Sequence, residues 1–156
     1  MREKIRAPVY DSICQDLKRF LFMMKSIPLK LIAPCGMNCA ICRSYLLSKC
    51  TGCRIRNKKC AFVKKRCEDN LKLLKGEVEY CFECQCFPCE ALVKLDDRNR
   101  KRYKMSMIDN LKVIQEKGIH QFVLIQNHCY QCPECGHMIS VHDQKCLYCN
   151  QPMKKE

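Results

Sequence analysis

The chain has 156 residues, 17 of them Cys and none Trp, and its Lys and Arg outnumber Asp and Glu by 29 to 16. This length suits one domain or two very small ones, and a Cys content this high is far above that of ordinary globular proteins. No apolar stretch approaches the roughly 20 residues that a transmembrane helix needs, and no signal peptide with a cleavage site is recognisable. We therefore expect a cytoplasmic protein, in which thiols spaced as CxxC pairs favour bound metal over disulfides.

Residues 1–30 carry no metal-ligand pattern and are expected to form an N-terminal helical extension. Asp11 or Ser12 can cap a helix that continues to about Ser26, because apolar residues recur between them at helical spacing. Pro28 then ends the helix. We expect this helix to pack on the rest of the chain or on a partner.

Residues 31–127 are expected to form a Cys-rich metal-binding domain that includes a helical hairpin. Short helices are predicted at about 40–47 and 68–74, and bound metal holds the segments between them. The candidate ligands fall into two groups of four, with two further cysteines that can exchange with them or belong to a third centre: Cys39, Cys42, Cys50 and Cys53; Cys60, Cys67, Cys81 and Cys84; and Cys35 with Cys89. Spacing alone does not choose among these partitions, and Cys86 has the weakest claim because it crowds the segment around it.

The Cys-free part of this domain, residues 90–127, is predicted to form three helices. The first runs from Glu90 to about Tyr103, the second is capped by Ser106 and closed by Gly118, and the third covers about 119–126. Together they supply the largest ordinary apolar core that the chain can build.

Residues 128–156 carry the clearest metal motif and are expected to form a zinc ribbon. Cys132 and Cys135 lie in the run CPECG, and ten residues separate them from Cys146 and Cys149. Two CxxC knuckles joined by a short hairpin let four thiolates converge on one Zn²⁺ ion, and Gly136 can adopt the positive φ that turns backbone N–H groups toward sulfur. Four other side chains near the motif are conceivable ligands with weaker claims: His128, Cys129, His137 and His142.

An iron–sulfur centre is the main alternative to zinc in the first Cys block. Cys35, Cys39 and Cys42 have the CxxxCxxC spacing that holds a 4Fe–4S cluster in radical SAM enzymes, but those enzymes need a barrel much longer than this chain. A run typical of bacterial ferredoxins begins in the second block and is incomplete, since Ile139 stands where its fourth Cys would lie. Zinc is therefore the preferred metal, at about three to four ions per chain, and each four-thiolate site makes the formal charge of +13 less positive.

With these motifs identified, the chain resembles the prokaryotic domain-of-unknown-function 3795 family over roughly residues 31–150. The segments that carry the resemblance are APCGMNCAICRSYL, CTGC, CFECQCFPCE, SMIDNLKVIQEKGI and the closing CPECG with CLYC. The resemblance implies a zinc-binding module whose strongest ligand candidates are the family positions: Cys35, Cys39, Cys42, Cys50, Cys53, Cys67, Cys81, Cys84 and Cys89. Cys86 falls where the family pattern has no Cys, and the family brings no established reaction.

Positive charge is concentrated in two stretches, residues 49–75 and 98–104. Basic loops held by rigid metal knuckles can contact phosphates without reading bases, although such residues also neutralise nearby thiolates or simply face solvent. The candidate partner-binding residues are Arg54, Arg56, Lys58, Lys59, Arg98, Arg100, Lys101 and Arg102.

We therefore expect a small metal-stabilised α+β fold, in which an α-rich domain with short zinc knuckles precedes a zinc-ribbon hairpin. The sequence shows no set of Ser, His and Asp, no phosphate-binding Gly loop and no paired carboxylates, so we predict a protein that is not an enzyme. The leading hypothesis is a zinc module that docks on RNA, a ribonucleoprotein or a protein complex, with no membrane and no small-molecule substrate. The alternatives are an iron–sulfur electron-transfer or cluster-handling protein, and a metal storage or trafficking protein.

Overall fold

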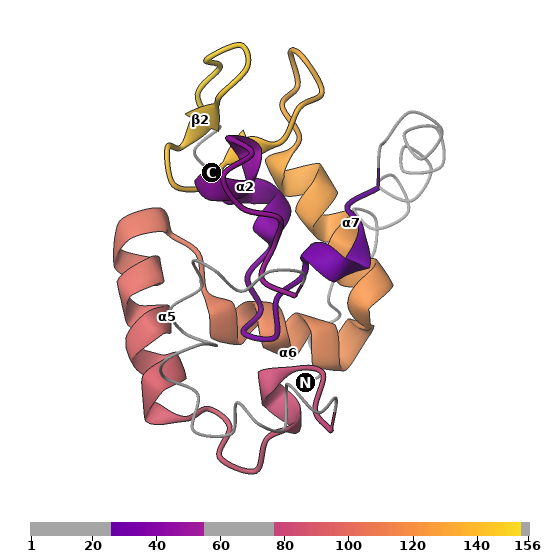
Figure 1. The fold of residues 1–156 in the computed structure, drawn as a ribbon, viewed down its shortest axis with the longest axis vertical. Coiled ribbons are helices and arrows are strands. Elements are labelled where there is room, and N and C mark those ends of the chain that lie inside the picture. The colour runs from indigo at the N-terminus through magenta and orange to yellow at the C-terminus, as the bar shows by residue number, and fades with distance from the viewer. Residues whose placement is uncertain (1–25, 55–76, 154–156) are drawn as a thin grey trace, which may run out of the picture.

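Three long α-helices form the frame of the described residues, 26–54 and 77–153, in this computed structural model (Figure 1). They are α5 at Glu90–Tyr103, α6 at Met107–Lys117 and α7 at Ile119–Tyr130. The bounds of α5 and α6 agree with the sequence prediction. In contrast, α7 runs past its predicted end at residue 126 and across the predicted domain boundary at 128. The helix therefore leads directly into the C-terminal cysteines.

Two of the predicted helices lie outside the described residues. They are the helix at 68–74 and, apart from its last residue, the N-terminal helix at 11–26. Several candidate site residues also lie there: Arg56, Lys58, Lys59, Cys60 and Cys67.

The ends of α5 and α6 are fixed by residues that leave the helical conformation. Lys104 ends α5 with a left-handed φ of 55°, and Ser106 caps α6 by accepting a hydrogen bond from the Asp109 amide at 2.9 Å. Gly118 ends α6 with a φ of 82°, and α7 begins at the next residue. The predicted cap at Ser106 and the predicted end at Gly118 are both confirmed.

Asp96 joins α5 to the start of α6. Its side chain is only 4 % exposed, and its Oδ1 accepts hydrogen bonds from the Ser106 hydroxyl at 2.8 Å and from the Ile108 amide at 2.9 Å. Its Oδ2 accepts from Arg100 Nε at 2.6 Å. Burial acts to raise the pKa of Asp96, but these donors outweigh burial and hold the pKa below its ordinary value. Asp96 is therefore a buried carboxylate that stays ionised at neutral pH.

Residues 26–54 run through the middle of the frame, between α5 and α7 (Figure 1). Their helices are all short: η1 at Leu29–Leu31, η2 at Cys39–Ile41 and α2 at Arg43–Leu46. The continuous helix predicted at 40–47 is wrong, because Cys42 is extended, with φ −78° and ψ 129°. The Ile41 carbonyl accepts a hydrogen bond from the Val141 amide at 3.0 Å, so a contact with the C-terminal hairpin replaces a helical one.

Gly36 allows this segment to touch α6. Its φ is 83°, and a Cβ at this position would lie 2.6 Å from the Met107 carbonyl oxygen and 2.9 Å from Leu111 Cγ. The Gly36 carbonyl accepts a hydrogen bond from Asn110 Nδ2 at 2.9 Å. Any larger residue would push the turn after Cys35 away from α6.

A second run of cysteines, residues 81–89, directly precedes α5 in the sequence. It begins with η3 at Cys81–Glu83, where the Glu83 carboxylate accepts hydrogen bonds from the Glu79 and Tyr80 amides at 2.9 and 3.2 Å. The Cys81 amide donates to the Pro34 carbonyl at 2.9 Å. This bond fixes the start of the run beside the turn that carries Cys35.

The C-terminal segment forms a two-stranded antiparallel sheet and docks on α2. Its strands are β1 at Ile139–Ser140 and β2 at Lys145–Cys146, with Ile139 opposite Cys146. Arg43 makes two contacts with the turn between the strands. Its guanidinium pairs with Asp143 at 3.1 Å, and its backbone N–H donates to His142 Nδ1 at 3.3 Å.

Buried apolar residues form two clusters of unequal size. The larger one lies between the helices and residues 26–54, and its most buried members are at most 1 % exposed: Ile32, Ile41, Leu92, Leu111, Phe122 and Val141. The smaller one consists of Cys132, Ile139 and Cys146. The described part of the chain is thus a small helix-rich fold with one short sheet, and none of its helices is long and apolar enough to cross a membrane.

Candidate metal centres

Four cysteines of the C-terminal segment converge on one point. The Sγ atoms of Cys132, Cys135, Cys146 and Cys149 all lie within 4.8 Å of one another. Two pairs, Cys132 with Cys149 and Cys135 with Cys146, are 3.5 Å apart. Zn–S bonds of about 2.3 Å in a tetrahedron separate the sulfur atoms by about 3.8 Å. The four thiols therefore have the spacing of ligands to a single metal ion.

The backbone hydrogen bonds around the two CxxC pairs follow the same pattern. The Cys132 amide donates to the His137 carbonyl at 2.8 Å, and the Gly136 amide donates to the Cys132 carbonyl at 2.9 Å. At the second pair, the Cys146 amide donates to the Gln151 carbonyl at 2.8 Å, and the Asn150 amide donates to the Cys146 carbonyl at 3.0 Å. The segment therefore contains the same knuckle twice, once before β1 and once beginning at the end of β2.

Each knuckle depends on one residue with a left-handed backbone. Gly136 has φ 71° and Asn150 has φ 63°, and each directly follows the second Cys of its pair. Gly and Asn are the residue types that adopt this conformation most readily. Gly136 was recognisable from the sequence, whereas the matching role of Asn150 was missed, although its place after Cys149 is the same.

Two of these thiols, Cys146 and Cys135, have pKa values shifted in opposite directions by their surroundings. Burial acts to raise the pKa of Cys146, but backbone N–H groups of Cys149 and Tyr148 and neighbouring thiols outweigh it and lower the pKa to about 7. At Cys135, the His137 amide acts to lower the pKa, but burial and the three nearby thiols raise it to about 12. The pKa of Cys146 therefore lies below that of Cys135.

The histidine nearest to these thiols lies outside the group of four. His137 Nδ1 is 3.1 Å from the Cys135 carbonyl oxygen, and its ring stacks on Tyr148 with centroids 4.1 Å apart. Both rings stand on the outer side of the knuckles, and Tyr148 is 72 % exposed. The four described ligand atoms that converge are therefore all sulfur.

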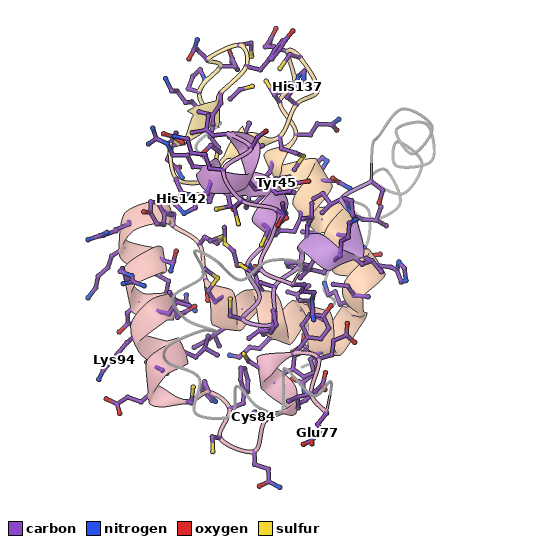
Figure 2. All side chains as sticks on the ribbon, viewed as in Figure 1. Tyr45, Glu77, Cys84, Lys94, His137 and His142 are labelled. Atoms are coloured by element: carbon purple, nitrogen blue, oxygen red, sulfur yellow. The ribbon has the colours of Figure 1, made fainter. Side chains whose placement is uncertain are left out.

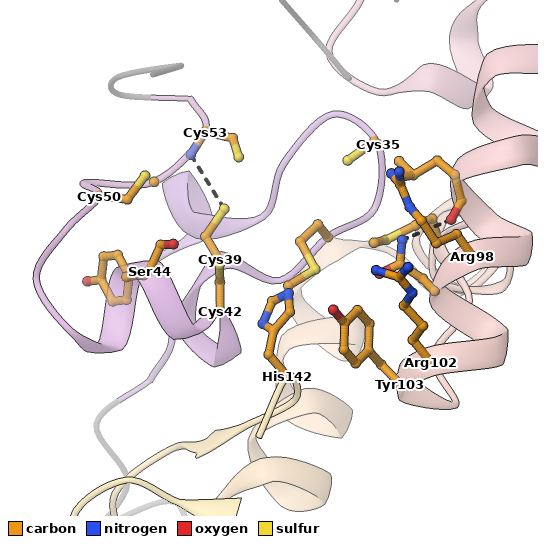
Figure 3. A pocket seen from close by; sticks show the side chains of 16 residues that line it. Cys35, Cys39, Cys42, Ser44, Cys50, Cys53, Arg98, Arg102, Tyr103 and His142 are labelled. Carbon is orange, nitrogen blue, oxygen red and sulfur yellow. Dashed lines mark hydrogen bonds between the residues drawn. The ribbon is translucent and has the colours of Figure 1, made fainter. Parts of the chain in front are cut away.

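A second cluster of cysteines surrounds a cavity of about 370 Å³ between residues 35–53 and α5. The cysteines that line it are Cys35, Cys39, Cys42, Cys50 and Cys53. Figure 3 shows four of them together on one side, with Arg98 and Arg102 of α5 on the other and Cys35 on the side of Arg98. Within residues 26–54 and 77–153, no three of these cysteines bring their sulfur atoms within 4.8 Å of one another. Their arrangement thus differs from that of the C-terminal site.

The cavity wall supplies hydrogen-bond donors as well as thiols. The Cys53 amide donates to Cys39 Sγ at 3.4 Å, a contact drawn in Figure 3. His142 lines the cavity below Cys42 and packs edge-on against Tyr103, with ring centroids 4.7 Å apart. Burial raises the pKa of Cys42 and lowers the pKa of His142. A charged ligand in this cavity would therefore have to replace much of its hydration by protein donors.

The cysteines of the run 81–89 lie apart from the C-terminal four, and the run begins beside the turn that carries Cys35, where the Cys81 amide bonds to the Pro34 carbonyl. Figure 2 places Cys84 at the opposite end of the molecule from His137 of the C-terminal knuckle. Cys81, Cys84 and Cys89 are half-buried, whereas Cys86 is exposed. The predicted group of Cys81 and Cys84 with Cys60 and Cys67 has two members outside the described residues. Its partition, and the role of Cys89, stay predictions.

The candidate partner-binding arginines are largely engaged within the chain. Arg54 donates to the Ile32 carbonyl at 2.6 Å and its guanidinium lies 4.8 Å from the centre of the Tyr80 ring. Arg100 pairs with Asp96 at 2.6 Å and with Asp109 at 2.9 Å. Arg98 and Arg102 line the cavity but are exposed, as is Lys101, and none of these three side chains forms an ion pair with another described residue.

No family model, no curated protein and no solved structure matches the chain. The resemblance to the domain-of-unknown-function 3795 family therefore stays a prediction from the sequence motifs. The geometry of the described residues is the basis on which a function can be assigned.

Proposed function

We propose that the protein is a zinc-binding module and that its C-terminal segment is a zinc ribbon closed around one Zn²⁺ ion. The observation that carries the proposal is the convergence of four sulfur atoms from two identical knuckles. Four thiolates fill the tetrahedral coordination of zinc, which is typical of structural sites, whereas a catalytic zinc keeps one position for water or substrate. Such a site supports a scaffold and not a reaction.

The small apolar cluster of this segment explains why a metal is needed there. Apart from Cys132 and Cys146 themselves, its one fully buried apolar side chain among the described residues is Ile139. Structural zinc contributes on the order of 10 kcal/mol or more to the folding of small modules, which is far more than one buried aliphatic side chain contributes. On this proposal the metal holds the hairpin together and keeps the turn at His142 docked on α2.

Zinc binding is tested by replacing one ligand and one neighbouring cysteine. We expect Cys149→Ser to lose one zinc ion per chain in native mass spectrometry after brief exposure to a chelator, because a serine hydroxyl is a poor zinc ligand. Cys129→Ser is the matched control, since Cys129 is exposed on α7 and could pair with Cys132 only in another register. It should keep all the zinc of the wild type.

Two results of this experiment would contradict the proposal. Zinc content that is the same in Cys149→Ser and the wild type would exclude zinc from the four-sulfur site. Loss of zinc in Cys129→Ser with retention in Cys149→Ser would assign the ion to the alternative register.

We further propose that the module docks on RNA through exposed basic residues, and among the described candidates Lys101 is the one that neither forms an ion pair nor lines the cavity. Lys101 is exposed on the last turn of α5 and forms no ion pair with a described residue. We expect Lys101→Glu to weaken binding of a mixed-sequence RNA oligonucleotide in a filter assay, most strongly at low salt. The control is Lys112→Glu, which makes the same charge change on the exposed face of α6. Equal weakening in both variants would show a general charge effect and contradict a docking site.

A further inference from the structure

We infer that the cavity between residues 35–53 and α5 is a second metal centre and that it takes a 4Fe–4S cluster instead of a single ion. The inference goes beyond the proposed zinc site, from which it differs in residues and in cofactor. It rests on three observations: the spacing of the thiols, the size of the cavity beside them, and the donors and cations in the wall.

The spacing of the thiols separates the two kinds of site. At the C-terminal site all four sulfur atoms lie within 4.8 Å of one another, as one ion requires. Around the cavity, no three of the described cysteines approach one another this closely. A cubic cluster binds each of its four thiolates at a different iron, so its ligands stand further apart than those of one ion. The spacing around the cavity thus departs from that of a single-ion site in the direction that a cluster requires.

The size of the cavity agrees with this spacing. The cavity beside the cysteines has a volume of about 370 Å³, which gives room for a cubic cluster, whereas a single tetrahedral ion needs no such space. Figure 3 shows Cys39, Cys42, Cys50 and Cys53 along one side of that space. These four cysteines form two CxxC pairs on one chain segment, and we assign them as the cluster ligands. Cys35 lies across the cavity and is left as a lining residue.

The wall matches the electrostatics of a cluster held by four thiolates. The Cys53 amide donates to Cys39 Sγ at 3.4 Å, and hydrogen bonds to ligand sulfur stabilise reduced clusters. His142 Nδ1 accepts from the Arg43 amide, so the neutral ring carries its proton on Nε2 as a further donor. Arg98 and Arg102 face the thiols and offset the net negative charge of the bound cluster. On this inference, Arg98 and Arg102 serve the cluster, whereas the sequence alone suggested that they bind a partner.

The experiment uses the full chain purified without oxygen. We expect a brown protein with about four iron and four acid-labile sulfide per chain. Cys42→Ser should lose iron, sulfide and visible absorption while it keeps the C-terminal zinc. Cys86→Ser is the control, because Cys86 is exposed and does not line the cavity, and it should keep the cluster. Cys149→Ser should remain brown while it loses zinc, which separates this inference from the proposed zinc site.

A colourless anaerobic protein would overturn the inference, and so would a second zinc ion that disappears in Cys42→Ser. If Cys42→Ser does not fold, the wild type decides alone. Reconstitution with ferrous iron and sulfide must then give the absorption of a cluster and a paramagnetic resonance signal after reduction, and the absence of both overturns the inference.

The reduction potential of the cluster gives a second test, because it should respond to the charge of the arginines and not to a purely structural role. Arg98→Gln and Arg102→Gln each remove one positive charge from the cavity wall, so the reduction potential of the cluster should become more negative. Lys94→Gln makes the same charge change on α5, at a side chain that Figure 2 shows pointing away from the body of the molecule, and it should leave the potential unchanged. An equal shift in all three variants, or no shift in any, would overturn the assignment of the arginines to the cluster.

Discussion

At the scale of single residues, the fold depends on a few backbone conformations that most side chains avoid. Gly136 and Asn150 close the two C-terminal knuckles with positive φ, and Gly36 closes the turn after Cys35. All three stand directly beside a cysteine. The course of the chain beside these cysteines therefore depends on residues that adopt the left-handed conformation readily.

Gly36→Ala should be strongly destabilising. The substitution adds a Cβ within 2.6 Å of the Met107 carbonyl and forces a non-glycine residue into φ 83°. Overpacking typically costs about 1–3 kcal/mol, and this adds to a backbone cost of about 1–3 kcal/mol. Gly118→Ala is the matched control, since its φ is 82° but a Cβ there meets no atom within 4 Å. Denaturant unfolding should show a clearly larger loss for Gly36→Ala; equal losses would mean that the contact with α6 contributes nothing.

At the scale of elements, the α5–α6 hairpin is held by one buried carboxylate. Asp96 accepts hydrogen bonds from the cap residue Ser106, from the first turn of α6 and from Arg100. Because Arg98 and Arg102 lie on the same helix, Asp96 also fixes the wall of the cavity. Asp96 thus anchors α5 from its buried side, while Arg98, Lys101 and Arg102 remain exposed on the same helix.

Asp96→Asn should destabilise the hairpin at neutral pH by about 1–3 kcal/mol, because an amide cannot replace a carboxylate that accepts three hydrogen bonds. The folded state lowers the pKa of Asp96, so its contribution is complete above the unfolded pKa of about 3.9 and is lost as the pH falls through the folded value. The difference in unfolding midpoint between wild type and variant should therefore stay constant above about pH 5 and shrink below about pH 4. Asp97→Asn, at an exposed neighbour, should show no such difference. A difference that grows on acidification would contradict this role of Asp96.

The same scale shows which elements were predictable from sequence. The bounds of α5 and α6 followed from local signals, a cap at Ser106 and a glycine at 118, and both are confirmed. The predicted helix at 40–47 was wrong because its continuity is broken by a contact with Val141, a hundred residues further along. A local pattern carries no information about such a partner.

At the scale of the whole molecule, the two proposed metal centres differ in how far the sequence determines which residues form them. The C-terminal site consists of two short knuckles on one hairpin. The spacing of its four cysteines in the sequence was therefore enough to predict that they lie together. The cavity takes its wall from residues 35–53, from α5 and from His142 of the C-terminal turn. The sequence suggested four of its thiols as a group, but the role of the arginines and of His142 emerges only when the three segments are folded together.

His142 also connects the two centres. It lines the cavity with its ring and stands four residues before Cys146, in the turn that Arg43 and Asp143 fasten to α2. Zinc in the C-terminal knuckles would therefore fix one wall of the cavity. On the two proposals made above, metal binding at the hairpin would thus support the shape of the second centre through this turn.

The central claim is that the C-terminal knuckles enclose one zinc ion with sulfur ligands alone. Zinc K-edge X-ray absorption of the purified full chain tests it most directly. The account predicts four sulfur neighbours at about 2.3 Å and no nitrogen or oxygen ligand, with the signal lost in Cys149→Ser. A zinc shell that contains nitrogen or oxygen, or an all-sulfur shell that survives in Cys149→Ser unchanged, would contradict it.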